Sequence, residues 1–329
     1  MWFRELVGFE ETTAHSVRAQ LEVDGEQMRS LVNGREMGCG TLDISSVAEL
    51  RTRTAGLVGA MGQSELSCVV GDAGALHRDP VNRGATFQVA SQFNLLEMVS
   101  PEVGPEHGVS GYENDLTQGP ACAVACGAGT IYRNYFVEVG GKIGQSRESQ
   151  VDCLAGIGRS LFPDGSVPWT MTNGYAMFDR SALDEVNERL GSMDEAELDA
   201  VKAQLRVGVH ADVEVTSSSS QHRVTQVYCS ALPVGYHNHP TRSFEPLARL
   251  VLDAAYEATL LAAALNASRT GNRTVFLTLV GGGVFENPKS WIVDAIDRAF
   301  RIVTDADLNV AIVSYGELDP AVVELARRL

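Results

Sequence analysis

Basic residues are scarce in this chain. Its 329 residues contain 26 lysines and arginines against 42 aspartates and glutamates, which gives a formal net charge of −16 at pH 7. Lysine itself occurs only at positions 142, 202 and 289. This excess of negative charge argues against general binding to nucleic-acid phosphates or to anionic membranes. A small anionic ligand is still compatible with it, because a pocket can bind phosphate through backbone N–H groups alone.

Features of several other protein classes are also absent from the sequence. No stretch approaches the ~18 apolar residues of a membrane span, and the N-terminal MWFRELVGFEETTAH lacks the basic start and apolar run of a signal peptide. The six cysteines are scattered, unlike the dense disulfide framework of a small secreted domain. We therefore expect a soluble, cytoplasmic protein without nucleic-acid or membrane partners.

The C-terminal third of the chain predicts an α/β fold. Strands are expected at 205–215, 223–234, 274–280 and 308–316, with a long helix at 243–268 and another at 288–300. Such alternation predicts right-handed crossovers and a mainly parallel central sheet. Two earlier apolar segments, 66–70 and 85–93, are further strand candidates. In open sheets of this class, ligands bind beyond the carboxyl ends of the strands.

The rest of the chain divides into an extension and an insertion. Residues 1–64 are expected to form an N-terminal helical extension packed on the core, with helices over 17–34 and 45–55. Residues 65–329 form the main domain, with a mostly helical insertion at about 143–203.

Two segments of the main domain have regular patterns. The small residues of 119–136 predict one helix that packs close to a sheet. The strict alternation of 205–215 predicts a half-buried strand, with Val207 and Val209 on one face and His210 and Asp212 on the other.

A glycine-rich loop is the strongest local signal for ligand binding. Gly281, Gly282 and Gly283 follow the strand at 274–280 and precede a helix. Glycines let the backbone approach a ligand closely, and the N–H groups that follow them can hold a phosphate. The loop is not a Walker A motif, because no Gly-Lys-Ser/Thr follows it. An ordinary tight turn is the alternative interpretation.

A second signal joins a strand to a helix start. The strand at 85–93 is followed by Asn94 and Glu97, and a loop then brings Asp115 to a helix that begins near Gly119. The N-terminus of that helix offers free N–H groups and positive partial charge, which suit a second phosphate contact and keep Asp115 ionised as a general base. Alternatively, Asp115 and Thr117 only cap the helix.

Five segments carry a resemblance to a known family. They are FQVASQFN (87–94), YENDLTQGPACA (112–123), YCSALPV (228–234), AAYEATL (254–260) and GGGVFENPKSW (281–291). Together they resemble the macrodomain family and its poly(ADP-ribose) glycohydrolase relatives, and are most similar to the MavL-type branch of ADP-ribosylhydrolases. The chain lacks the GGGVxxAI loop of simple macrodomains. It also lacks the glycohydrolase GGG…QEE signature, because Gly119-Pro120 follows Gln118 in place of the paired acids.

The resemblance implies a three-layer α/β/α fold and a specific reaction. ADP-ribose and a mono-ADP-ribosylated protein are the implied ligand and substrate, and the implied activity is removal of ADP-ribose from arginine side chains. No metal or other cofactor is implied. The implied substrate-binding residues are Asp72, Asn94, Glu113, Asn114, Thr117, Gln118, Gly119, Gly281, Gly282, Gly283, Val284, Phe285, Asn287 and Tyr315.

Three acids are candidates for the chemistry. Cleavage of a glycosidic bond at the distal ribose passes through an oxocarbenium-like transition state, which a carboxylate can stabilise or help water to attack. Asp115 is the first choice, Glu97 the second, and Glu257 the third, since Glu257 is an acid among apolar neighbours. A buried salt bridge is the alternative for Glu257, and a simple turn is the alternative for Asp72, which could bind the adenine amino group.

Other functions remain open at this level. A non-catalytic ADP-ribose reader, a hydrolase of another ADP-ribose linkage, and a structural protein whose glycine loops are only turns each fit part of the pattern. Cys122 and Cys126 lie four residues apart on one helix face, but without clustered partners they predict buried small residues and not a zinc site.

Overall fold

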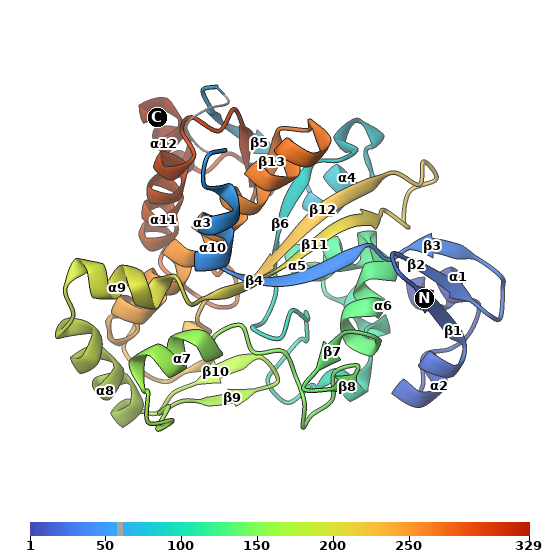
Figure 1. Cartoon of the computed structure of the whole chain (residues 1–329), viewed down its shortest axis with the longest axis horizontal. Coiled ribbons are helices and arrows are strands. Elements are labelled where there is room, and N and C mark those ends of the chain that lie inside the picture. Colours follow the sequence, from blue (N-terminus) through green and yellow to red (C-terminus); the bar gives the residue numbers. More distant parts are fainter. Residues whose placement is uncertain (58–61) are drawn as a thin grey trace.

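A seven-stranded sheet forms the centre of the molecule (Figure 1). The structure, a computed structural model, describes residues 1–57 and 62–329. The strand order is β4 (Thr41–Ser46), β11 (Arg206–Glu214), β12 (Arg223–Cys229), β6 (Thr86–Ala90), β13 (Thr274–Leu277), β14 (Asn309–Ser314) and β5 (Glu65–Val70). Strand β11 is antiparallel to β4 and β12, whereas the pairs from β12 to β5 are all parallel. Five neighbouring strands therefore end at the same edge of the sheet.

Helices cover both faces of this sheet. Neighbouring residues of β6 show this directly, because Phe87 stacks on His77 of α4 (Ala73–Arg78) with ring centroids 3.7 Å apart, while the Gln88 amide donates to Thr259 of α10 (Glu245–Thr270) at 3.2 Å. Successive strand residues point to opposite faces. Helices α3 (Val47–Thr54), α11 (Lys289–Ile302) and α12 (Pro320–Arg328) lie with α10, and α5 (Gln118–Ala125) and α6 (Gly127–Tyr135) lie with α4. The predicted three-layer α/β/α fold with a mainly parallel sheet is confirmed.

Helix α10 is the core helix of the molecule. By length and composition alone it could cross a membrane, with a mean hydropathy of 1.3 over its most apolar window, but 89% of that window is buried inside the protein. Its small and apolar side chains pack against the sheet and against α11. This burial explains its composition, since a helix that is apolar all round suits the interior of a large domain.

The N-terminal segment is not the helical extension that the sequence predicted. It contains α1 (Trp2–Val7), α2 (Ala14–Ala19), α3, and an antiparallel sheet of β1 (Leu21–Asp24), β2 (Gln27–Ser30) and β3 (Glu36–Gly38). The predicted helix over 17–34 is wrong, because Gly25 adopts φ 57° in the turn between β1 and β2. The predicted helix over 45–55 is confirmed as α3, where Ser46 and Glu49 form a reciprocal capping box. The next strand, β4, joins the central sheet.

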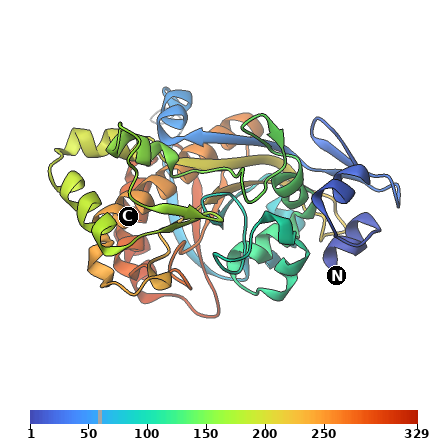
Figure 2. The same cartoon turned by 90° about the horizontal axis from the view of Figure 1, so that it is seen from below.

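The insertion is helical only in part. It contains α7 (Ala155–Leu161), α8 (Arg180–Gly191) and α9 (Glu195–Lys202), but also the hairpin of β9 (Thr170–Thr172) and β10 (Tyr175–Met177). A second short hairpin, β7 (Glu138–Val139) and β8 (Lys142–Ile143), precedes it. Figures 1 and 2 show the insertion at the opposite end of the molecule from α1, α2 and β1–β3.

Two regular patterns are interrupted in the structure. The alternation along β11 shifts register between His210 and Val213, where Asp212 adopts φ 55°, and His210 becomes fully buried instead of facing outward. Such a bulge adds one residue to one strand of a pair. The helix expected over 119–136 is broken at Cys126 into α5 and α6.

Candidate functional site

A cavity of about 720 Å³ lies at the edge where the five parallel strands end. Each strand contributes the residues that follow it. These are Gly71 and Asp72 after β5, Ser91 and Gln92 after β6, Ala231 after β12, Thr278 to Phe285 after β13, and Tyr315 after β14. Ligands in open α/β sheets bind at this edge, and the volume is typical of a small-molecule site.

The glycine loop after β13 forms one wall of this cavity. Gly281 adopts φ 83°, and a Cβ atom there would lie 2.5 Å from the Ala231 Cβ atom, so both backbone conformation and space favour glycine. The Asn287 side chain fastens the loop from inside by donating to the Leu232 carbonyl at 2.8 Å, and the Asn287 N–H donates to the Gly281 carbonyl at 2.9 Å. The loop is therefore held in one shape before any ligand arrives.

This loop leaves backbone donors free. The N–H groups of Gly283, Val284 and Phe285 have no hydrogen-bond partner within the described parts of the chain. All three residues line the cavity, and a Cβ atom on Gly283 would meet nothing within 4 Å. Consecutive free N–H groups of this kind form an anion-binding concavity.

The start of α5 forms the opposite wall and presents a second set of donors. Gly119 allows a close approach to β6, because a Cβ atom there would lie 2.1 Å from the Ala90 carbonyl oxygen. The Gln118 amide reinforces this contact, accepting from the Ala90 N–H and donating to the Gln88 carbonyl, both at 2.9 Å. Thr117 precedes the helix and its side chain caps no helical N–H. The first N–H groups of α5 thus remain available to a ligand.

Asp115 lies at the cavity beside this helix start. Its Oδ1 atom accepts hydrogen bonds from the Thr117 N–H at 2.9 Å and from the Thr117 hydroxyl at 2.6 Å. The carboxylate is half-buried and lines the cavity. Asp115 therefore shapes the turn before α5, as the capping interpretation expects, while one carboxylate oxygen is left for other partners.

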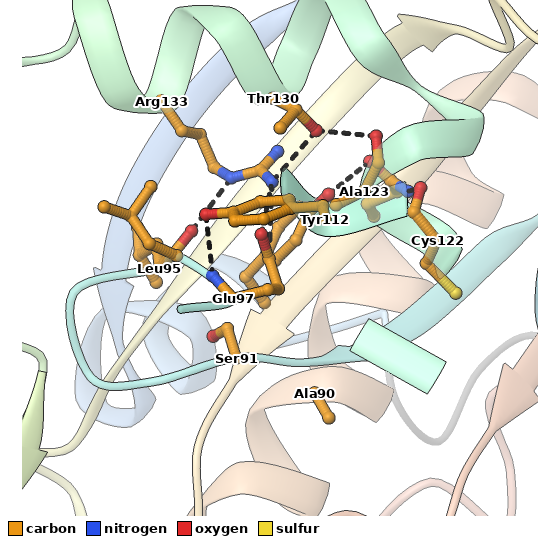
Figure 3. A network of polar contacts seen from close by, with 12 residues as sticks. Ala90, Ser91, Leu95, Glu97, Tyr112, Cys122, Ala123, Thr130 and Arg133 are labelled. Carbon is orange, nitrogen blue, oxygen red and sulfur yellow. Dashed lines mark hydrogen bonds and ion pairs between the residues drawn. The ribbon is translucent and has the colours of Figure 1, made fainter. Parts of the chain in front are cut away.

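Glu97 lines the same cavity but is almost fully enclosed, with 3% of the residue exposed. Its two carboxylate oxygens each lie 3.4 Å from Nη2 of Arg133 on α6, and its backbone N–H donates to the Tyr112 hydroxyl at 3.0 Å (Figure 3). Burial raises the pKa of Glu97 to about 7, although Arg133 acts in the opposite direction. A carboxyl group that titrates near neutral pH in a cavity suits proton transfer.

Glu257 lies away from the cavity, and the structure corrects its predicted catalytic role. Its carboxylate pairs with Nε of Arg51 at 2.5 Å and with Nζ of Lys202 at 3.3 Å, and its side chain is 2% exposed. Arg51 also pairs with Asp199 at 2.6 Å. Glu257 thus joins α10 to α3 and α9 through buried salt bridges, as the alternative interpretation of this residue expected.

Three predicted ligand contacts also lie outside the cavity lining. Asn94 is fully buried, with its Nδ2 donating to Gln150 at 2.8 Å and its Oδ1 accepting from the Leu96 N–H at 3.1 Å. Glu113 is exposed and accepts from the Trp2 N–H at 3.0 Å. Asn114 is exposed but does not border the cavity. The structure corrects these predictions, because Asn94 and Glu113 use their polar groups elsewhere in the fold and all three residues stand apart from the cavity wall.

The remaining predicted residues do meet at the cavity. Asp72 caps α4 through the Ala75 N–H at 2.6 Å, and Tyr315 is 84% exposed at the rim. The predicted residues that line the cavity are Asp72, Glu97, Asp115, Thr117, Gln118, Gly119, Gly281, Gly282, Gly283, Val284, Phe285, Asn287 and Tyr315.

Sequence reasoning missed an aromatic wall and a buried arginine. Tyr175 from the insertion hairpin and Tyr236, which follows β12, both pack on Phe285, with ring centroids 5.6 and 5.7 Å apart, and all three rings line the cavity. No local pattern places Tyr175 there. Arg133 did carry a signal, since a cation within the small-residue segment 119–136 needs a partner when that segment is buried.

Metal ligands do not cluster in the part of the chain that the structure describes: no group of three or more His, Cys, Asp or Glu side chains could hold an ion there. Cys122 and Cys126 are both free thiols buried in the core.

Comparison with known proteins gives structural neighbours only. No family model and no curated protein matches the chain. A poly(ADP-ribose) glycohydrolase from Deinococcus radiodurans in complex with ADP-ribose is 11% identical, with a TM-score of 0.44 over 88% of this chain and 93% of that chain. The enzyme from Thermomonospora curvata bound to the inhibitor ADP-HPD is 13% identical, with a TM-score of 0.42 over 99% of both chains. At these values the similarity does not decide ligand or reaction, which rest on the site itself.

Proposed function

We propose that this protein is an ADP-ribosylhydrolase that releases ADP-ribose from arginine side chains of proteins. The observation that carries the proposal is one cavity with a preformed glycine loop of free N–H groups on one wall, the open start of α5 on another, and the buried acid Glu97 beside them. Two sets of backbone donors suit the two phosphates of a dinucleotide-like ligand.

The remaining lining suits the two ends of ADP-ribose. Asp72 and the exposed Tyr315 lie after neighbouring strands β5 and β14 and offer an acceptor and a ring face for adenine. Phe285, Tyr175 and Tyr236 form an apolar wall near the glycine loop, which would hold the distal ribose and keep water ordered around it.

Glu97 is the acid that we assign to the reaction. In its ionised form it stabilises the oxocarbenium-like transition state or takes a proton from the attacking water. A pKa near 7 leaves enough carboxylate for this role at neutral pH. Asp115 remains a second candidate, because one of its oxygens is free of the helix turn.

Charge supports arginine as the modified residue. Among the described residues that line the cavity, the acids Asp72, Glu97, Asp115, Glu317 and Asp319 stand against one basic side chain, Lys289, which itself pairs with Asp319. A guanidinium would be attracted to this lining, whereas a neutral serine linkage would gain nothing comparable.

Matched substrates test the proposal. The same protein or peptide, mono-ADP-ribosylated through arginine, serine or glutamate, is incubated with the chain at low and high ionic strength. We expect the arginine linkage to be released fastest and its apparent affinity to fall as salt increases.

Three outcomes would contradict parts of the proposal. Faster release from serine or glutamate would leave an ADP-ribosylhydrolase but remove the arginine assignment. Binding of ADP-ribose in a calorimeter without release from any substrate would indicate a reader module. Absence of binding would remove ADP-ribose as the ligand.

A further inference from the structure

Arg133 pairs with Glu97, and its Nη2 atom lies 3.4 Å from both carboxylate oxygens. Its side chain is 0% exposed. Arg133 belongs to α6, whereas Glu97 lies in the loop that follows β6. Figure 3 shows its guanidinium between Glu97, Leu95 and Thr130. Arg133 is absent from the cavity lining, so it has no direct access to a ligand there.

Several contacts fix the position of this guanidinium. Nε donates to the Leu95 carbonyl at 3.0 Å, and Nη2 donates to the Thr130 hydroxyl at 3.2 Å as well as to Glu97. The guanidinium also lies over the ring of Tyr228 from β12, with its carbon 3.6 Å from the ring centroid. A planar group held in this way cannot follow a moving carboxylate, so it defines where the Glu97 carboxylate sits.

Arg133 is also the charged group that acts most directly on the pKa of Glu97. The other titratable groups packed around the pair are Tyr112, Tyr228, Cys122, Cys126 and His210. Burial lowers the pKa of His210, on β11, to about 3, so its ring is neutral. Burial raises the pKa of the two tyrosine hydroxyls and the two cysteine thiols well above their usual values, so these four groups stay neutral too. Within the described cluster, the protonation of Glu97 therefore responds chiefly to burial and to Arg133.

We propose that Arg133 is a positioning residue of the active site, which holds the Glu97 carboxylate in place at the cavity. The inference rests on the proposed function, because Glu97 is the acid assigned to glycosidic cleavage. Arg133 would thus affect the reaction rate without contacting the ligand. Arg133 acts only through Glu97, since no other carboxylate in the described chain pairs with it.

The first test is the pH dependence of ADP-ribose release by Arg133→Met in the full chain. In the unaltered protein the rate should rise with pH through a midpoint near 7. Without the neighbouring positive charge, that midpoint should move upward by about one pH unit or more. The rate at pH 7 should then fall about fivefold or more and recover at higher pH, with KM little changed. An unmoved midpoint would overturn the proposal.

Arg189→Met is the matched control. Arg189 also stacks on an aromatic ring, that of Phe162 at 4.2 Å, and donates to the Leu161 carbonyl at 2.8 Å, but it lies in the insertion and outside the cavity lining. Its loss should leave the midpoint of the rate profile where it is. An equal shift in both variants would assign the effect to general loosening and contradict a specific role for Arg133.

A direct titration separates this proposal from the proposed function. Glutamate side chains labelled with ¹³C at the carboxyl carbon report the Glu97 midpoint by NMR, with Glu97→Gln to identify the signal. Arg133→Lys keeps a charge without the planar fork, so it provides a readout of the fixed geometry if Arg133→Met does not fold. We expect a higher midpoint in both, with a smaller rise in Arg133→Lys because its positive charge remains. An unaltered midpoint in every folded variant would overturn the positioning role, whether or not the protein releases ADP-ribose.

Discussion

The Glu11 carboxylate accepts a hydrogen bond from the Tyr135 hydroxyl at 2.7 Å, which joins the N-terminal segment to α6. The same carboxylate accepts from the N–H groups of Val109 and Ser110, the latter at 2.6 Å. Ser110 begins the short helix η3 (Ser110–Asn114), which carries Tyr112 to Glu97. The N-terminal segment therefore braces the loop that leads to the cavity.

Glu11→Gln should loosen this brace. The change removes the charge that three donors share, so we expect the free energy of unfolding to fall by about 1–3 kcal/mol. Urea unfolding measures the loss, and limited proteolysis should cut the loop at 99–117 sooner. The matched control is Glu10→Gln, whose exposed pair with Arg4 should contribute about 0.5 kcal/mol or less. Equal losses in the two variants would contradict the brace.

Gly283→Glu should place a carboxylate among the free N–H groups of the glycine loop. The side chain fits, because a Cβ atom there meets nothing within 4 Å and the residue lies outside the left-handed backbone region. We expect ADP-ribose to bind at least about tenfold more weakly, or roughly 1.4 kcal/mol. Calorimetry measures this, and Gly283→Ala should stay within about threefold of the unaltered chain. Unchanged affinity in a folded Glu variant would remove the phosphates from this loop.

Two variants separate the capping role of Asp115 from its chemical role. Asp115→Ala loses both and should cost about 1 kcal/mol of stability. Asp115→Asn keeps an acceptor for the Thr117 N–H but loses the charge. If the carboxylate takes part in the reaction, the Asn variant should be as stable as the unaltered chain and lose turnover, with ADP-ribose affinity within about tenfold. Full turnover by the Asn variant would leave Asp115 as a cap.

Glu97 should give the protein a measurable dependence of stability on pH. Its pKa is raised from 4.5 to about 7 in the folded chain, so the folded state holds a proton that the unfolded state has released. The stability that this proton contributes is fully present below pH 4.5 and is lost as pH rises through 7. Relative to Glu97→Gln, the unaltered chain should lose about 3 kcal/mol across this range. Parallel stability curves for the two proteins would show that Glu97 titrates at its ordinary value.

The amino-acid pattern alone was sufficient for much of the sheet. The burial of β13, β14 and α10 can be predicted from their composition. Each is a continuous apolar segment, which is typical of an element enclosed on all sides. The capping box of α3 is equally local, since Ser46 and Glu49 hydrogen-bond each other across three positions. The three glycines after β13 also predicted a loop by themselves, although contacts with the distant Ala231 and Leu232 fix its shape. These features therefore predicted both the fold class and the edge of the sheet at which the cavity lies.

Tertiary structure decided which side chains face that cavity. Glu97 and Asn94 are three positions apart in one loop, yet Glu97 lines the cavity and Asn94 is turned into hydrogen bonds with Gln150. Arg133 pairs with Glu97 from α6 and lies 36 positions further along the chain.

The same dependence on packing explains the other departures from prediction. Tyr175 reaches the cavity only because the insertion folds a hairpin against Phe285. Residues 21–24 and 27–30 pair as strands because Gly25 allows the turn between them. The periodicity of apolar residues along a chain indicates which face of one helix or strand is buried. It carries no information about which distant segment covers that element, because such contacts form only when the segments pack.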